Sequence, residues 1–302
     1  MPVAGAIVAG VHPVDAVRSA GGAASRARVL GAGVTRRDLE RAVRDRQLTR
    51  TGRGYSLPDA PVELRVAAGA GASVGCVSAL RVHGVEVPGA REPVHLVVAS
   101  SRPVRGAVVH RGVRGTAAGL AEAPLAATVR ALRCLDRHRC LAVVDGVVRS
   151  GLADLDQLTV AVGTRPGPAA RWILAHADPR SESVLESLLR ALLVDAHVGG
   201  IDLQVDVAGV GRVDILIGGW LVVEADGFAS HADREHYRND RRRLDAQLRC
   251  GLVTLWFSFE DVLGAPEDVV ATVSEVLRRR RRRVFRLAVP GGAVRDRQWT
   301  GP

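Results

Sequence analysis

Three acidic side chains near the C-terminal end of the chain lie in segments that are otherwise apolar. Asp214 lies in the stretch RVDILI, and Glu224 and Asp226 lie in LVVEADG. Residues two apart in a β-strand share one face, so Glu224 and Asp226 are expected on the same side of a strand. Because an ionised carboxylate is costly to bury unpaired, these positions favour a hard cation such as Mg²⁺. A bound Mg²⁺ can activate water for attack on a phosphodiester.

The turn between the two segments decides whether Asp214 and Glu224 meet. A strict two-residue hairpin at Gly218-Gly219 would place Asp214 opposite Val223 and point Glu224 to the other face. A three-residue loop or a bulge would place Asp214 opposite Glu224, and the metal-site hypothesis requires this second register. The alternative is an edge strand with solvated acids, or acids paired with arginines of the next helix.

The elements around these acids form the last of three predicted domains, residues 171–288. The stretch SESVLESLLRALLVDAHV predicts an amphipathic helix on which Glu182 and Glu186, four residues apart, share a face. Three antiparallel strands with Gly-rich turns are expected next. A polar helix with Leu244 and Leu248 facing inward, a strand at GLVTLWFS and a closing helix complete the domain.

The first predicted domain, residues 10–60, consists of three short helices followed by a hairpin. Its third helix begins with the capping-box-like sequence TRRD, and a Gly-rich turn joins two strands in LTRTGRGYSL. This order is typical of the winged helix-turn-helix, in which basic residues hold DNA through its phosphates. The arginines expected to do so are Arg36, Arg37, Arg41, Arg44 and Arg53. The alternative is a small helical cap whose arginines are only solvated.

Residues 61–165 form the second predicted domain, a mixed α/β segment. A helix is expected at ASVGCVSALRVHGV, strands at PVHLVVAS and GAVVHRGV, and one or two helices in ATVRALRCLDRHRCLAVVDGVVRSGL. A linker is expected at residues 164–171. We assign this domain no chemistry, because its histidines show no metal-binding spacing and are expected to be ordinary surface or loop residues. They are His83, His95, His110 and His138.

Composition and charge favour a polyanionic partner. The chain has 302 residues and a net charge of +10, and all 42 basic residues are arginines. The positive excess lies in the first two domains, which suits binding to nucleic acid. The cysteines contain no CxxC pair, which argues against a zinc site or a disulfide framework and fits a reducing cytoplasm. No apolar run approaches the roughly 18 residues of a membrane span, and the N-terminus lacks the basic start of a secretory signal.

Residues 180–263 resemble the Vsr-like branch of the PD-(D/E)XK nuclease superfamily, the relatives of very-short-patch-repair endonuclease. The similar stretches are SVLESLLR, VDILI, VVEADGFASH and DRRRLDAQLRCGLVTLWFSFEDV. The resemblance implies a restriction-endonuclease-like fold that uses Mg²⁺, with Mn²⁺ as a substitute. It implies that Asp214 and Glu224 bind the metal, and that Glu186 binds it or orients a water.

The same resemblance implies roles for the residues that follow the third strand. Asp226 falls where the superfamily usually has a lysine, and the whole chain lacks lysine. Asp226 and His231 would complete the catalytic set, with His231 as a general acid or base. Arg243 and Leu248 match the helix that supports the site. Arg243 would contact the cleaved strand, or form a salt bridge to the nearby acids.

The N-terminal half resembles AbiEi-type antitoxins. The similar stretches are GVTRRDLERAVRDRQLTRTGRGYSL, SALRVHGV and AATVRALRCLDR followed by AVVDGVVRSGL. The resemblance implies a protein that binds promoter DNA and represses transcription. It also implies a cognate toxin or another protein as a partner of the middle domain.

We therefore expect an α+β protein with an N-terminal winged helix-turn-helix, an α/β middle segment and a C-terminal restriction-endonuclease-like mixed sheet flanked by helices. The expected function is that of a cytoplasmic, Mg²⁺-dependent endonuclease that hydrolyses DNA phosphodiesters. The alternative is an AbiEi-like antitoxin or repressor with a catalytically weak or inactive nuclease-like domain. An RNA-directed enzyme of the same fold is a third hypothesis.

Overall fold

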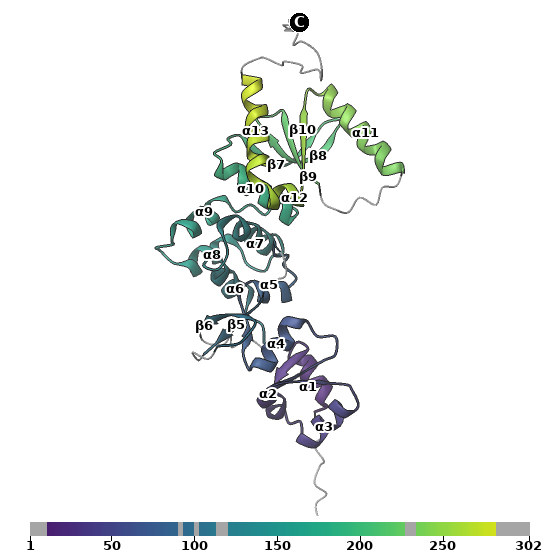
Figure 1. Ribbon diagram of the computed structural model, residues 1–302, viewed down its shortest axis with the longest axis vertical. Coiled ribbons are helices and arrows are strands. Elements are labelled where there is room, and N and C mark those ends of the chain that lie inside the picture. The colour runs from purple at the N-terminus through teal and green to yellow at the C-terminus, as the bar shows by residue number, and fades with distance from the viewer. Residues whose placement is uncertain (1–10, 90–92, 100–102, 113–119, 227–233, 282–302) are drawn as a thin grey trace, which may run out of the picture. The chain divides into compact units, whose positions relative to one another are not determined.

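The computed structural model describes residues 11–89, 93–99, 103–112, 120–226 and 234–281, with the backbone alone for residues 234–240 and 281 (Figure 1). Helices and strands both contribute, so the expected mixed α and β character is confirmed. The chain divides into two compact units, Met1–Pro179 and Arg180–Pro302. In the part of the chain that the structure describes, no helix is long and apolar enough to cross a membrane.

The first unit begins with three short helices and a small antiparallel sheet of strand order β1-β3-β2. The elements are α1 (Pro13–Ser19), β1 (Ala23–Ser25), α2 (Arg26–Gly31), α3 (Arg36–Arg44), β2 (Thr49–Thr51) and β3 (Gly54–Ser56). The expected helices and hairpin are present, and β1 is an additional strand. Thr35 caps α3 as its sequence predicts, because the Thr35 hydroxyl accepts the Asp38 N–H at 3.1 Å. Val17, Val29 and Leu39 are buried in the core between these elements.

Helix α4 (Val62–Ala70) packs against the hairpin and leads into the second half of this unit. The Arg53 N–H donates to the Gly69 carbonyl at 3.1 Å, which ties the hairpin turn to α4. A Cβ atom at Gly52 would lie 2.7 Å from the Gly69 oxygen, so this close approach of two backbones requires glycine.

The rest of the first unit is a three-stranded sheet of order β4-β5-β6 with five helices. The elements are β4 (Ser73–Val74), α5 (Cys76–Val82), β5 (Val94–Val98), β6 (Ala107–Arg111), α6 (Pro124–Ala131), α7 (Arg137–Arg149), α8 (Leu155–Val162) and α9 (Pro168–His176). β5 and β6 are parallel. The sequence places the start of the third domain at residue 171, whereas α9 packs against α7 and α8 and belongs to the first unit. The division between the units falls after Pro179.

The second unit is a four-stranded mixed sheet with helices beside it. The elements are α10 (Val184–Asp195), β7 (Ile201–Val207), β8 (Gly211–Ile217), β9 (Leu221–Asp226), α11 (Arg234–Arg249), β10 (Val253–Ser258), α12 (Phe259–Gly264) and α13 (Pro266–Arg281). The strand order is β10-β9-β8-β7, with β7, β8 and β9 antiparallel and β10 parallel to β9. Figure 1 shows α11 across the sheet from α13. Leu185, Leu188 and Leu189 form the predicted apolar stripe of α10 and are buried.

The orientation of α11 differs from the expectation. Leu244 and Leu248 were expected to face inward, but Leu248 is 62% exposed and Leu244 is 37% exposed. Ala246 and Gln247 are buried instead, and the Gln247 side-chain oxygen accepts the Thr254 hydroxyl of β10 at 2.9 Å. A buried amide needs this partner, so the hydrogen bond fixes the rotation of the helix against the strand.

Candidate functional site

The loop between β8 and β9 contains three residues, and this brings two of the predicted acids together. The register pairs Ile217 with Leu221 and Ile215 with Val223. Carried one residue further, it places Asp214 opposite Glu224, as the metal-site hypothesis requires. The backbone pairing of the two strands ends at Ile215 and Val223, and Asp214 Oδ2 accepts the Ala225 N–H at 2.9 Å. The sheet therefore opens where the two carboxylates meet.

Glu224 is a buried carboxyl group, with 8% of its surface exposed. Burial, with the neighbouring Asp214 charge as the second cause, raises the pKa of Glu224 to about 7. Arg243 on α11 opposes this shift, because its Nη2 atom lies 2.8 Å from Glu224 Oε1. Arg243 Nη2 also donates to the Arg212 carbonyl. The arginine is therefore bound within the unit, which is the acid–arginine pairing that the sequence left open.

Glu186 approaches the same pair from the first turn of α10. Ser183 caps this helix by accepting the Glu186 N–H at 3.1 Å. Glu186 Oε2 accepts the Glu182 N–H at 2.7 Å and the Gln204 side-chain amide at 2.8 Å. Burial is the main cause that raises the pKa of Glu186, and the charge of Asp214 adds to it. Glu186, Asp214 and Glu224 thus form one electrostatically coupled carboxylate site.

Gln204 is a site residue that sequence reasoning missed. It lies in β7 with φ +52°, a left-handed conformation that residues other than glycine rarely adopt. The strand partners on either side, Leu203 with Ile215 and Val205 with Val213, place Gln204 beside Asp214. Its side-chain amide holds Glu186. Strained residues of this kind cluster at functional sites, but nothing in the local sequence signals a positive φ at a glutamine.

Asp226, another member of the predicted catalytic set, is not part of this buried cluster. Asp226 ends β9, where its side chain is exposed and the parallel register pairs it with Ser258. His231 lies outside the described residues. The three coupled carboxylates offer the hard oxygen atoms that Mg²⁺ and Mn²⁺ prefer, but their ligand atoms do not all lie within 4.8 Å of one another. The donor chemistry therefore fits a divalent cation, and binding one would require the carboxylates to move closer together.

The predicted DNA-contacting arginines of the first unit are all exposed. Helix α3 buries Leu39 and Ala42 and directs its arginines outward. The exposed residues are Arg36, Arg37, Arg41 and Arg44, together with Arg53 in the turn between β2 and β3. Arg41 comes within 4.0 Å of Asp38, a distance at which an exposed pair contributes little. We call the four arginines of α3 the α3 arginine surface.

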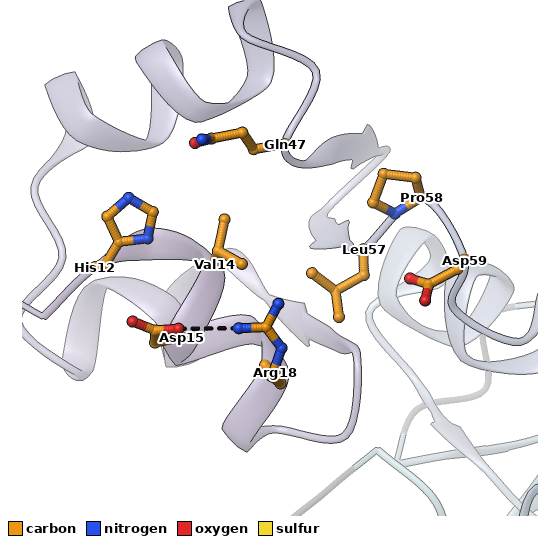
Figure 2. Close-up of a pocket in the computed structure, with 8 residues that line it drawn as sticks. All are labelled: His12, Val14, Asp15, Arg18, Gln47, Leu57, Pro58 and Asp59. Atoms are coloured by element: carbon orange, nitrogen blue, oxygen red, sulfur yellow. Dashed lines mark hydrogen bonds and ion pairs between the residues drawn. The ribbon is translucent and has the colours of Figure 1, made fainter.

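A cleft beside α1 contains none of the predicted residues. Figure 2 shows the side chains that line it, among them Val14, Gln47 and Leu57. Its charged groups include Asp15 and Arg18, which form an exposed ion pair at 3.0 Å. This ion pair balances the charges of Asp15 and Arg18, and we assign the cleft no chemistry.

The positions of two histidines of the first unit, His95 and His110, differ from the expectation of surface or loop residues. His95 and His110 lie in the neighbouring strands β5 and β6, and His95 is 2% exposed, so neither is a surface loop residue. Their ring nitrogens meet the thiols of Cys76 and Cys134. Among the described residues, these four form the one set of three or more Cys, His, Asp or Glu side chains whose ligand atoms all lie within 4.8 Å of one another. The four come from separate segments of chain, so no sequence spacing signals the cluster.

Comparison with known proteins gives a family but no activity. No protein-family model matches the chain, and no solved structure matches it. Two similar proteins of Mycobacterium tuberculosis are described as "Uncharacterized protein MT2308" (strain CDC 1551 / Oshkosh) and "Uncharacterized protein Rv2248" (strain ATCC 25618 / H37Rv). Each is 30% identical over 196 residues, which make up 60% of this chain and 71% of the relative. The chain therefore belongs to the same family as these mycobacterial proteins.

Proposed function

We propose that the protein is a metal-dependent DNA endonuclease whose second unit hydrolyses phosphodiester bonds. The observation that carries the proposal is the meeting of Asp214 with Glu224 at the opened edge of β8 and β9, with the pKa of Glu224 raised to about 7. A buried carboxyl pair of this kind favours a bound divalent cation, which lowers the cost of ionising both groups. The mixed sheet with helices beside it agrees with the nuclease resemblance.

Each residue of the coupled carboxylate site has a distinct role in this proposal. Asp214 and Glu224 would hold Mg²⁺ or Mn²⁺, and Glu186, positioned by Gln204, would complete the oxygen donors. When bound, the ion would activate water and neutralise charge on the phosphate. Asp226 falls where the nuclease superfamily that this unit resembles has a lysine, and it cannot supply a positive charge. Arg243 of α11, 2.8 Å from Glu224, supplies that charge instead.

The first unit would bring DNA to this site. The element order α1-β1-α2-α3-β2-β3 agrees with a winged helix-turn-helix in which α3 is the recognition helix. The α3 arginine surface would hold phosphates, and some of its side chains would reach base edges. We therefore propose DNA as the polyanionic partner.

A second candidate function is that of a DNA-binding repressor or antitoxin. The observation that favours it is the Glu224–Arg243 ion pair, which already neutralises one of the two central carboxylates without a metal ion. In that case the second unit would serve binding or assembly, and a toxin or another protein would bind the middle domain, residues 61–165.

A metal-dependent cleavage assay separates the two functions. The full chain would be incubated with supercoiled plasmid, single-stranded DNA or RNA, in Mg²⁺, Mn²⁺ or EDTA. We expect metal-dependent nicking of plasmid that Asp214→Asn and Glu224→Gln abolish. Asp206→Asn is the matched control, because Asp206 is an exposed acid of β7 outside the cluster, and this variant should keep full activity. Absence of cleavage in every metal, with salt-sensitive DNA binding intact, would favour the repressor.

A further inference from the structure

The first unit contains a second group of potential metal ligands, chemically unlike the carboxylates. The side chains of Cys76, His95, His110 and Cys134 converge in its second half, with Cys76 and His95 buried and the other two half-buried. We propose that these four residues bind one zinc ion as a closed Cys₂His₂ site that stabilises the first unit. This proposal does not rest on the nuclease function, because no residue of the carboxylate site takes part.

The distances between the ligand atoms suit tetrahedral coordination. His95 Nδ1 lies 3.0 Å from His110 Nε2, and Cys134 Sγ lies 3.6 Å from His95 Nδ1 and 3.9 Å from His110 Nε2. All four ligand atoms lie within 4.8 Å of one another. Bonds of about 2.0–2.1 Å to nitrogen and about 2.3 Å to sulfur give tetrahedral edges of about 3.3–3.8 Å. The observed separations are close to these values before any adjustment.

Four different elements position the ligands. His95 and His110 lie on adjacent parallel strands, and His110 pairs with Val97, so both rings project from the same face of the sheet. Cys76 is the first residue of α5, and the Gly75 N–H donates to the His95 carbonyl at 3.0 Å. Cys134 lies in the turn after α6, where its N–H donates to the Ala131 carbonyl at 2.9 Å. Backbone hydrogen bonds thus hold these residues, which are distant in sequence, close to one another.

The backbone at Cys76 is shaped to present its thiol. Cys76 has φ +54°, a conformation that costs a residue with a Cβ about 1–2 kcal/mol. Its N–H donates to Glu122 Oε2 at 3.3 Å. A Cβ atom at the preceding Gly75 would overlap Val97, so only glycine fits beside the strand. Strain of this kind persists only where the surroundings enforce it, and it typically marks a functional position.

An ion pair between the buried Glu122 and the half-buried Arg130 supports the backbone that carries the ligands. Arg130 binds Glu122 with Nη2–Oε1 at 2.7 Å and Nε–Oε2 at 3.1 Å, and Glu122 is 5% exposed. Glu122 then holds the Cys76 backbone, while the His95 N–H donates to the buried Ser78 hydroxyl at 2.9 Å. His110 also lines a cleft with Glu122 and Arg130, which gives an ion a path to the site. Metal sites depend on such outer partners and on an entry path.

The donor types select the metal. Two thiolates and two imidazoles in tetrahedral arrangement suit zinc, whereas Mg²⁺ requires oxygen ligands. Four protein ligands leave no open coordination position, so the ion would be structural and would not activate water. Such an ion stabilises the fold directly, because the unfolded chain does not hold the four ligands together.

The test is the metal content of the full chain, purified after expression in zinc-supplemented medium. Elemental analysis should find one zinc ion per chain. Cys134→Ser and His110→Asn, which change the two half-buried ligands, should lose that zinc. Cys250→Ser should retain it, because Cys250 is an exposed free thiol of the second unit. Asp214→Asn should also retain it, which separates this result from the cleavage assay.

Cobalt substitution gives a readout that needs no variant. Co²⁺ added to the reduced apoprotein should produce the absorption bands of a tetrahedral cobalt–thiolate centre, and zinc should displace them. Chelation should lower the melting temperature of the wild-type chain but not that of His110→Asn. Absence of zinc together with absence of the cobalt spectrum would overturn the proposal. So would a Cys76–Cys134 disulfide, detected by mass spectrometry, in protein purified under reducing conditions.

Discussion

At the scale of single residues, Glu224 links the electrostatics of the carboxylate site to the stability of the protein. Its carboxyl group has a pKa of about 7 in the folded protein, against an ordinary value of 4.5. Folding therefore favours the protonated form. The corresponding stabilisation is fully present below the ordinary pKa and is lost as the pH rises through about 7. Glu186, whose pKa is also raised, contributes in the same direction.

We predict that Glu224→Gln weakens this pH dependence. In the metal-free wild-type chain, the free energy of unfolding should fall between about pH 4.5 and pH 7, because the ionised Glu224 is buried. The variant should show a shallower decrease in urea unfolding measured across that range in EDTA. The decrease in unfolding free energy that remains in the variant should come from Glu186. An unchanged slope in the variant would mean that Glu224 ionises normally in the folded protein.

A substitution at Gln204 tests whether this residue positions Glu186. Gln204→Ala removes the amide that holds Glu186 Oε2 but leaves Asp214 and Glu224 in place. We expect the cleavage rate to fall by roughly 10–100-fold, as for other outer partners of metal ligands. Higher Mg²⁺ should restore part of the rate, and DNA affinity should not change. A variant with wild-type activity at all Mg²⁺ concentrations would remove Gln204 from the site.

At the scale of elements, the loop between β8 and β9 decides the pairing of the acids. Gly218 and Gly219 have φ values of +58° and +75°, which allow the three-residue connection to Leu221. Replacing Gly218-Gly219 with Asn-Gly would favour a two-residue type I′ turn that pairs Ile217 with Trp220, so that Asp214 would face Val223. We predict that this replacement abolishes metal-dependent cleavage.

Gly219→Ala is the control for that replacement. A Cβ atom at Gly219 would meet no other atom within 4 Å, so the substitution costs only the left-handed backbone, about 1–2 kcal/mol. The register should stay unchanged, and so should the cleavage rate of the folded protein. Cleavage at the wild-type rate by the Asn-Gly variant, with NMR showing Asp214 opposite Val223, would show that the Asp214–Glu224 register is not required.

The α3 arginine surface gives the second element-scale prediction. Replacing Arg36, Arg37, Arg41 and Arg44 with alanine should weaken DNA binding and reduce the dependence of its affinity on salt. The slope of log affinity against log salt concentration should fall by about 0.9 for each arginine that contacts a phosphate. Arg18→Ala is the control, because Arg18 is an exposed arginine of α1 already paired with Asp15. Equal affinity and slope in the quadruple variant would place DNA binding elsewhere.

At the scale of the whole molecule, the two compact units carry different chemistry. The first unit holds the arginine surface and the soft thiol and imidazole donors, and the second holds the hard carboxylate donors. Because the donor sets differ, each unit is expected to select its own metal ion. The mycobacterial relatives share 196 aligned residues with this chain, so the same experiments on them would test whether these features belong to the family.

The sequence alone determined the local elements, because periodicity and capping are properties of short segments. The apolar stripe of α10, the Thr35 cap of α3 and the strands around Asp214 and Glu224 all follow from neighbouring residues. The acids themselves were visible for the same reason, since a carboxylate in an apolar strand is conspicuous. The wrong orientation of Leu248 shows the limit, because a polar helix has no strong stripe to set its rotation.

Only the tertiary structure decided which of these residues meet. The register of Asp214 and Glu224 depended on one residue of loop length, and the ion pair with Arg243 depended on how α11 packs. The left-handed conformation of Gln204 left no mark on the local sequence. The Cys and His cluster needed the parallel pairing of β5 with β6 and the turn after α6. Such contacts join distant segments, and their geometry is set by the packing of the whole unit.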